Sequence, residues 1–194
     1  MNVKKKLISF SVIFFFLVCC CLYVYAACTQ AAYNPTYWNN NATTKNNNNC
    51  YNYAMNTVTN TYAQPGKATY GTTCNSCCWS TDGYVANLAL ADLATSSMGL
   101  SKTTSAASCP SGQTKIMLAV STTNQDYHWY RHDVGGGWSH KMGGTEATNQ
   151  TYYGSGVVIT SPDAAAYAIG YNSFHQYFCY CGSSTQGGAG APIQ

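Results

Sequence analysis

Charge is scarce in this sequence. Asp, Glu, Lys and Arg together make up 8% of 194 residues, and nine basic side chains face six acidic ones. Three of the basic residues, Lys4, Lys5 and Lys6, lie at the N-terminus, so the rest of the chain is formally neutral. No basic stripe remains to neutralise phosphates, and we expect no nucleic-acid partner.

The first 26 residues are predicted to be a secretory signal peptide. The three lysines precede an apolar stretch from Leu7 to Val24, and the small residues Ala26 and Ala27 come directly after it and Tyr25. Translocation machinery recognises this order, and we expect cleavage after either alanine. One alternative is an uncleaved anchor, because the stretch approaches the roughly 20 residues of a membrane span. Another is a lipoprotein site at Cys28. A secreted protein without stable membrane anchoring is the favoured interpretation.

The chain beyond the leader is long enough for one compact domain with a core. Residues 27–49 are rich in Asn, Thr and Tyr without an apolar period, which predicts an irregular arm. Residues 50–182 are predicted to form a single catalytic-type domain, and the Gly- and Ser-rich residues 183–194 a flexible tail. The sequons at Asn41 and Asn149 predict a glycoprotein if the host is a eukaryote.

Two helices are expected in the first half of the domain. Cys50, Ala54 and Val58 are spaced four apart, which predicts a helix over 50–61. Asp82 is suited to cap a second helix over 83–97, whose apolar residues surround most of its circumference.

The second half has the patterns of strands. Runs of apolar, aromatic or β-branched residues predict strands over 116–120, 127–131, 138–142, 157–159 and 177–181. The short glycine-rich segment at 133–137 predicts a hairpin between the second and third of them. Helices followed by antiparallel strands indicate an α+β fold.

Cysteine is the residue type with the clearest chemical meaning. Eight cysteines lie beyond the leader, at positions 28, 50, 74, 77, 78, 109, 179 and 181. An even number in an exported chain predicts four disulfides. Cys50 differs from the others because it opens a predicted helix, where unpaired N–H groups and the helix dipole favour the thiolate. If Cys50 is free, a second thiol must be free or must pair with another molecule.

Three of the four histidines fall on the predicted hairpin. Alternation along a strand places His128, Tyr130 and His132 on one face. A turn near Val134 then brings His140 opposite or diagonal to His128. A histidine held by a second polar group is the base that a thiol nucleophile needs. The alternatives are an exposed face with surface histidines, and a three-histidine metal site that lacks a carboxylate or thiol at typical spacing.

These residues carry a resemblance to a known superfamily. A cysteine at a helix start, a histidine on a first strand and a polar residue on the next strand resemble the papain-like cysteine hydrolases. The segments His128-Trp129-Tyr130-Arg131 and Trp138-Ser139-His140 are similar to the hairpin of the NlpC/P60 and CHAP groups. Most of residues 49–144 also resembles a group of uncharacterised exported proteins.

The resemblance implies a papain-like fold, with N-terminal helices packed on a small antiparallel sheet. It further implies that Cys50 is the nucleophile, that His128 is the general base and that His140 orients the imidazole, with no cofactor and no metal. The backbone N–H of Cys50 would help to stabilise an oxyanion.

The leading hypothesis is an exported thiol hydrolase that cleaves an amide bond in a peptide, protein or cell-wall substrate. The alternative from another class is a non-catalytic, disulfide-stabilised secreted binding module that presents tyrosine-rich surface to a glycan or protein. A further alternative is an inactive relative whose Cys50 is tied up in a disulfide.

Overall fold

The computed structural model describes residues 28–71, 83–94, 99–182 and 193–194. The predicted signal peptide, the predicted cap at Asp82 and the cysteines at positions 74, 77 and 78 lie outside these ranges. Within them, no helix combines the length and the apolar character that crossing a membrane requires.

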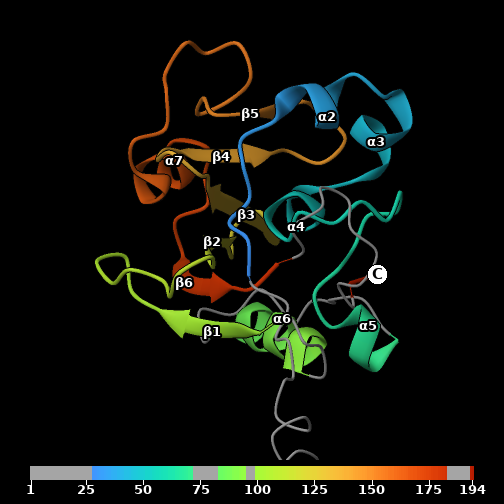
Figure 1. The fold of residues 1–194 in the computed structure, drawn as a ribbon, viewed down its shortest axis with the longest axis vertical. Helices are drawn as coiled ribbons and strands as arrows, with labels where there is room; N and C mark the ends of the chain where they lie inside the picture. Colours follow the sequence, from blue (N-terminus) through green and yellow to red (C-terminus); the bar gives the residue numbers. More distant parts are fainter. Residues whose placement is uncertain (1–27, 72–82, 95–98, 183–192) are drawn as a thin grey trace, which may run out of the picture.

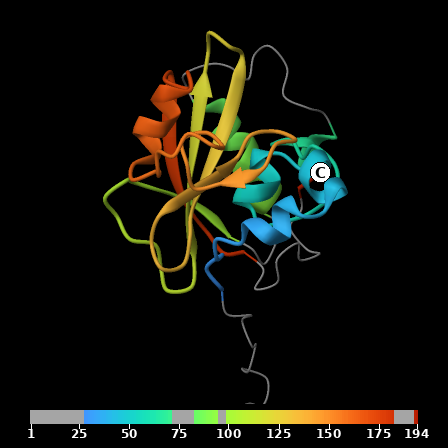
Figure 2. The same cartoon turned by 90° about the horizontal axis from the view of Figure 1, so that it is seen from above.

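The architecture is a six-stranded antiparallel sheet with helices on both faces, which confirms the predicted α+β class (Figures 1 and 2). The strands lie in the order β1-β6-β2-β3-β4-β5. Their bounds are β1 Leu100–Thr103, β2 Thr114–Ser121, β3 Asp126–His132, β4 Trp138–Lys141, β5 Ala147–Thr148 and β6 Phe174–Tyr180. The helices are α2 Pro35–Asn39, α3 Ala42–Asn47, α4 Cys50–Ala54, α5 Lys67–Tyr70, α6 Tyr84–Ala94 and α7 Pro162–Ala168.

Residues 116–120 of strand β2 are continuously apolar because helices cover both faces of the strand. Ile116, Leu118 and Val120 belong to the core cluster that also contains residues of α4 and α6. Met117 and Ala119 point to the other face and join the cluster that includes residues of α7. Figure 2 shows the sheet between these two groups of helices. A strand buried on both sides is expected to be a continuous apolar run rather than an alternating one.

Four of the predicted strands are confirmed, at 116–120, 127–131, 138–142 and 177–181, as is the hairpin between the second and the third. The connection from β3 to β4 is closed by a hydrogen bond from the Asp133 N–H to the Gly137 carbonyl at 3.0 Å. Gly135, Gly136 and Gly137 all have φ between 86° and 99°. Three consecutive residues in this region need glycine, which is why the sequence marks the turn so clearly.

Two other predictions about elements are wrong. The first helix ends at Ala54 rather than at residue 61, because Asn56 adopts a positive φ of 50° that terminates it. Residues 157–159 form no strand, and only an isolated bridge joins Val158 to Gln150. The short strands β1 and β5 and the helix α7 were not predicted, because each is too short for its periodicity to stand out.

The irregular arm predicted over 27–49 is also a wrong prediction, because most of residues 35–47 form α2 and α3. The asparagines of this segment act as caps: Asn34 accepts a hydrogen bond from the Tyr37 N–H, and Asn41 from the Thr44 N–H. Asparagine is unfavourable inside helices but strongly favoured at their N-caps. Trp38 of α2 is fully buried, which makes the segment part of the folded body.

Two disulfides join distant parts of the chain to β6 and the residue after it. Cys28 pairs with Cys181, and Cys109 pairs with Cys179. The prediction of complete pairing is wrong for Cys50, which is free and buried. The last two residues also depart from the predicted flexible tail: Ile193 is buried in the core, and the Gln194 carbonyl accepts a hydrogen bond from the Gln64 N–H.

Candidate functional site

Cys50 is the first residue of α4, and its position is set by a capping box. The Asn49 side chain accepts hydrogen bonds from the N–H groups of Tyr51 and Asn52, and the Asn52 side chain accepts one from the Asn49 N–H. The Asn49 amide also donates to the Ala63 carbonyl at 2.8 Å. Because the cap is satisfied from both sides, the helix begins at one defined residue. The cysteine is therefore held at a rigid point.

The sheet leaves an open edge beside this cysteine. Strand β4 pairs with β3 only from Tyr130 to His132, so the beginning of β3 extends past the end of β4. The Cys50 thiol lies at this edge, where the backbone of Trp129 provides hydrogen bonding to it. Cys50 and His128 both line the cleft at this edge.

His128 and His140 form a hydrogen-bonded pair. His140 is directly opposite Tyr130 in the register, which places it diagonal to His128 as predicted. The distance from His128 Nε2 to His140 Nδ1 is 2.7 Å, and His140 Nε2 lies 2.8 Å from the Gln150 carbonyl. His132 instead contacts Trp138. The described ranges contain no group of three or more potential metal-ligating side chains.

The direction of these hydrogen bonds is set by the last acceptor. A carbonyl oxygen can only accept, so His140 carries its proton on Nε2 and, when neutral, has an unprotonated Nδ1. That nitrogen accepts from His128 Nε2–H, and a neutral His128 is left with an unprotonated Nδ1. The pair therefore fixes the tautomer of His128 and gives it a free basic nitrogen.

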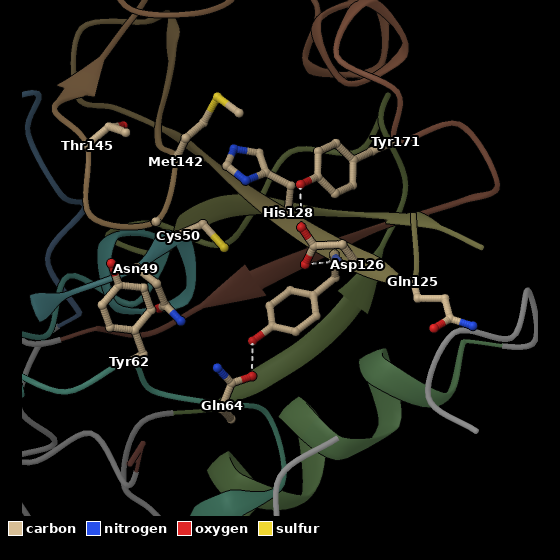
Figure 3. A pocket seen from close by; sticks show the side chains of 12 residues that line it. Asn49, Cys50, Tyr62, Gln64, Gln125, Asp126, His128, Met142, Thr145 and Tyr171 are labelled. Carbon is tan, nitrogen blue, oxygen red and sulfur yellow. Dashed lines mark hydrogen bonds between the residues drawn. The ribbon is translucent and has the colours of Figure 1, made fainter. Parts of the chain in front are cut away.

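Both candidate residues line the same cleft, which has a volume of about 700 Å³. Figure 3 shows the Cys50 sulfur and the His128 imidazole facing this space, with one ring nitrogen on the side of the sulfur. Among the hydrogen bonds of the described residues, none joins the two groups. The cleft is lined by Asn49, Cys50, Tyr62, Gln64, Gln125, Asp126, Tyr127, His128, Met142, Gly143, Thr145 and Tyr171.

Two tyrosines fix the planes of the histidine rings. The Tyr130 ring stacks on His140 with centroids 5.0 Å apart and planes inclined by 12°. The Tyr171 ring lies against His128 at 5.4 Å. Tyr171 is itself held by a 2.7 Å hydrogen bond from its hydroxyl to Asp126. Aromatic contacts thus restrict the imidazoles to one orientation, which serves positioning.

Burial decides the protonation states in the site. Removal from water raises the pKa of the Cys50 thiol to about 12, the Asp126 carboxylate adds to this rise, and the backbone N–H groups do not offset it. The expectation that the helix start favours the thiolate is therefore wrong for this resting state. Burial lowers the pKa of His140 to about 4, and burial with the neighbouring His140 lowers the pKa of His128 well below its usual value. At neutral pH the thiol is protonated and both imidazoles are neutral.

Gln64 is a cleft residue that sequence reasoning missed. The Tyr127 hydroxyl donates to Gln64 Oε1 at 2.6 Å, which turns the amide so that its NH₂ group has no acceptor among the described residues. In the sequence, Gln64-Pro65-Gly66 has only the local pattern of a turn. Its place in the cleft depends on the tertiary path of the chain, so no local pattern marks it.

A buried ion pair fastens α4 to the hairpin. The Arg131 guanidinium is fully buried and uses all five of its N–H groups. They donate to Asp133, to the Tyr53 carbonyl and hydroxyl, to Asn56 and to the Ala32 carbonyl, at 2.8–3.2 Å. Because Tyr53 belongs to α4 and Arg131 to β3, this network sets the distance between the cysteine helix and the histidine strand.

A buried lysine of β4 performs a similar role for the segment that precedes Cys50. The Lys141 ammonium donates three hydrogen bonds, to the carbonyls of Lys45, Asn48 and Gly143, at 2.5–2.6 Å. Two of these carbonyls lie in the segment that leads into α4. Lys141 therefore anchors the approach to the cysteine onto β4.

Comparison with known proteins identifies a partial relative. The chain is 40% identical over 111 residues to "Insoluble matrix shell protein 1" of Ruditapes philippinarum. This match covers 57% of the chain and 66% of that protein, so the chain spans just under two thirds of its length. No protein-family model matches the chain, and no solved structure matches it.

Proposed function

We propose that the protein is an exported thiol hydrolase that cleaves a peptide- or peptidoglycan-type amide bond through Cys50, His128 and His140, in a papain-like arrangement. The observation that carries this proposal is the chain from His128 through His140 to the Gln150 carbonyl. It leaves one basic nitrogen of His128 open at a cleft that also contains a free cysteine. An open acceptor nitrogen at a cleft is what a general base needs.

In the acylation step, the Cys50 Sγ–H proton moves to His128 Nδ1 while a bond forms between the sulfur and the carbonyl carbon of the substrate. His128 then gives this proton to the leaving nitrogen as the C–N bond breaks, and the product amine departs. His140 accepts the hydrogen bond from His128 Nε2–H throughout and stabilises the transient imidazolium. Because the resting thiol is protonated, His128 acts as a general base during the attack.

The negative charge on the substrate oxygen requires donors near Cys50. The backbone N–H of Cys50 is one, since the capping box uses the N–H groups of the next two residues instead. The Gln64 NH₂ group is a second candidate in the same cleft. Donors held in place before the reaction stabilise an oxyanion without reorganisation.

Deacylation reverses the roles. A water molecule gives a proton to His128 Nδ1 as its oxygen attacks the thioester carbon. The S–C bond then breaks, the product acid leaves, and the sulfur recovers a proton from His128. The two disulfides support an oxidising, extracytoplasmic location for this chemistry, as does the shell-matrix name of the relative.

A structural role in an extracellular matrix is the second candidate function. The relative's name and the surface of this chain favour it. Within the described ranges eight tyrosines are exposed, namely Tyr33, Tyr37, Tyr62, Tyr70, Tyr84, Tyr152, Tyr153 and Tyr167. Exposed tyrosine offers apolar area together with a hydrogen-bonding tip, which suits adhesion to a glycan or protein.

The test is to trap an acyl-enzyme. The purified protein is incubated with an activated ester of a short peptide, and the acylated residue is mapped by mass spectrometry. We expect acylation at Cys50 that is lost in Cys50→Ala and slowed about 10²- to 10⁴-fold in His128→Gln. Ser101→Ala, a change on exposed strand β1, is the matched control and should retain the wild-type rate. Equal acylation of wild type and His128→Gln would contradict the hydrolase and leave the matrix role.

A further inference from the structure

The side chains that line the cleft are almost all uncharged. Among the described residues that line it, Asp126 is the only one that is acidic or basic. The cysteine, the histidine and the tyrosines Tyr127 and Tyr171 of the cleft are neutral near pH 7, because burial raises the pKa of Cys50, Tyr127 and Tyr171 and lowers that of His128. The net charge that a bound substrate meets at the cleft wall is therefore negative.

Asp126 stands beside the reacting groups. It is the first residue of β3 and lies two positions before His128, so both side chains project from the same face. Two residues along a strand correspond to about 6–7 Å. In an extended substrate this distance corresponds to about two residues. Asp126 is thus placed to meet a group one or two positions from the scissile carbonyl.

The Asp126 carboxylate is held in one orientation and can still accept hydrogen bonds from a ligand. Its Oδ2 accepts from the Tyr171 hydroxyl at 2.7 Å and its Oδ1 from the Tyr127 N–H at 2.8 Å. A carboxylate has about four acceptor positions, so each oxygen can take a further hydrogen bond. Figure 3 shows Asp126 below Tyr171 and His128 at the side of the cleft, while Gln125 extends away.

No basic side chain of the cleft competes for this carboxylate. Lys141 interacts electrostatically with Cys50, but it is buried outside the cleft lining and bound to three carbonyls. The field of Asp126 does reach the sulfur, since its charge is among the causes that raise the pKa of Cys50.

From this geometry, and resting on the proposed thiol chemistry, we infer that Asp126 makes the site selective for substrates with a positive charge beside the scissile amide. The recognised group is an ammonium or guanidinium, carried either by a Lys or Arg side chain or by a free terminal amine. Asp126 is then a specificity-determining residue, with Tyr171 as the residue that positions it.

The first experiment needs no hydrolysis. Cys50 is modified with a cationic aminoethyl and an anionic sulfonatoethyl methanethiosulfonate. The rates are followed by mass spectrometry of the peptide that contains Cys50 and are divided by the rates for a small free thiol. We expect the cation-to-anion ratio to fall about tenfold in Asp126→Asn, because attraction of one reagent and repulsion of the other are lost together. Glu146→Gln removes the same charge outside the cleft and should leave the ratio unchanged.

The second experiment uses amide substrates that differ at one position. Three peptides are compared. The first is acetylated and has Lys beside the scissile bond. The second has norleucine at that position and a free N-terminus, and the third is uncharged. We expect one cationic peptide to exceed the neutral one by about two- to fivefold in kcat/KM, and the preference to disappear in Asp126→Asn. The better cationic peptide identifies the source of the charge.

The outcomes separate the two proposals. Reagent ratios that are equal in wild type and Asp126→Asn overturn the role of Asp126, even if hydrolysis is observed. An altered ratio without any acylation of Cys50 supports the cationic preference and overturns the hydrolase. If Asp126→Asn does not fold, the wild-type ratio in about 0.5 M salt serves instead. Screening by salt should bring the cation-to-anion ratio closer to one, and an unchanged ratio contradicts the inference.

Discussion

The β3–β4 hairpin carries two buried polar clusters, one on each face of the sheet, and they differ in completeness. On the face towards α4, Arg131, Asp133 and Ser139 satisfy one another and the Tyr53 hydroxyl. On the opposite face, His128 and His140 satisfy each other and the Gln150 carbonyl but leave one nitrogen of His128 open. Both clusters arise from alternate residues of the same strands.

The difference distinguishes a structural network from a reactive one. A fully buried ion pair stabilises a fold only when every donor and acceptor is matched, and the five donors of Arg131 meet this condition. A group that takes up a proton must keep an unmatched position at the surface that the substrate reaches. The network of Arg131, Asp133 and Ser139, called the closed cluster below, holds α4 against β3. The pair of His128 and His140, called the open cluster below, lies at the cleft that this contact positions.

The largest expected effect is on the open cluster. His140→Leu removes the hydrogen-bond acceptor that fixes the His128 tautomer and replaces it with an apolar side chain. We expect acylation of Cys50 to fall by about 10²- to 10⁴-fold, because the wrong tautomer presents a protonated nitrogen to the thiol. Stopped-flow acylation with the activated ester measures this. A loss below about threefold would show that the two clusters do not differ in function.

The next effect is on the closed cluster. Arg131→Met leaves the Asp133 carboxylate buried without its counter-charge, and we expect the free energy of unfolding to fall by about 3–5 kcal/mol. Chemical denaturation followed by tryptophan fluorescence measures it. Lys102→Met, which removes an exposed cation on β1, should change the value by no more than about 0.5 kcal/mol. A small loss in Arg131→Met would mean that the network is dispensable for stability.

The smallest effect is a pH dependence that belongs to the open cluster. The pKa values of His128 and His140 are lowered in the folded protein, so between about pH 6.5 and 4 the unfolded chain binds more protons. Stability from this source is complete above pH 6.5 and is lost as the pH falls. We expect His140, whose pKa is lowered to about 4, to contribute a loss of about 2 kcal/mol between pH 7 and 5, and the lowered pKa of His128 acts in the same direction. Burial raises the pKa of Asp133, which opposes this trend.

The comparison that isolates the histidines is wild type against His128→Gln combined with His140→Asn, because Asp133 is present in both. Denaturation at pH 7 and pH 5 gives the two differences. The wild type should lose more stability on acidification than the double variant. Equal losses would contradict neutral, buried imidazoles in the native state.

Much of the hairpin could be predicted because its signals are local. The glycines at 135–137 mark the turn, and the two-residue period of β3 places His128 and Tyr130 on one side. The diagonal relation of His140 to His128 is set by the turn length. The two N-terminal helices were missed because their asparagines indicate disorder by composition, although in this fold they cap helices.

The sequence by itself determined the chemistry available to this protein: a cysteine at the start of a helix, two histidines across a tight turn, and a chain with little charge. Local spacing suffices for these features because capping, strand alternation and turn geometry act over a few residues. Only the tertiary structure decided what state those groups adopt. Burial keeps the Cys50 thiol protonated and the imidazoles neutral, since desolvation outweighs the helix start. The fold also brings Gln64 and Asp126 to the cleft, because contacts between distant segments are set by packing and leave no pattern in the sequence.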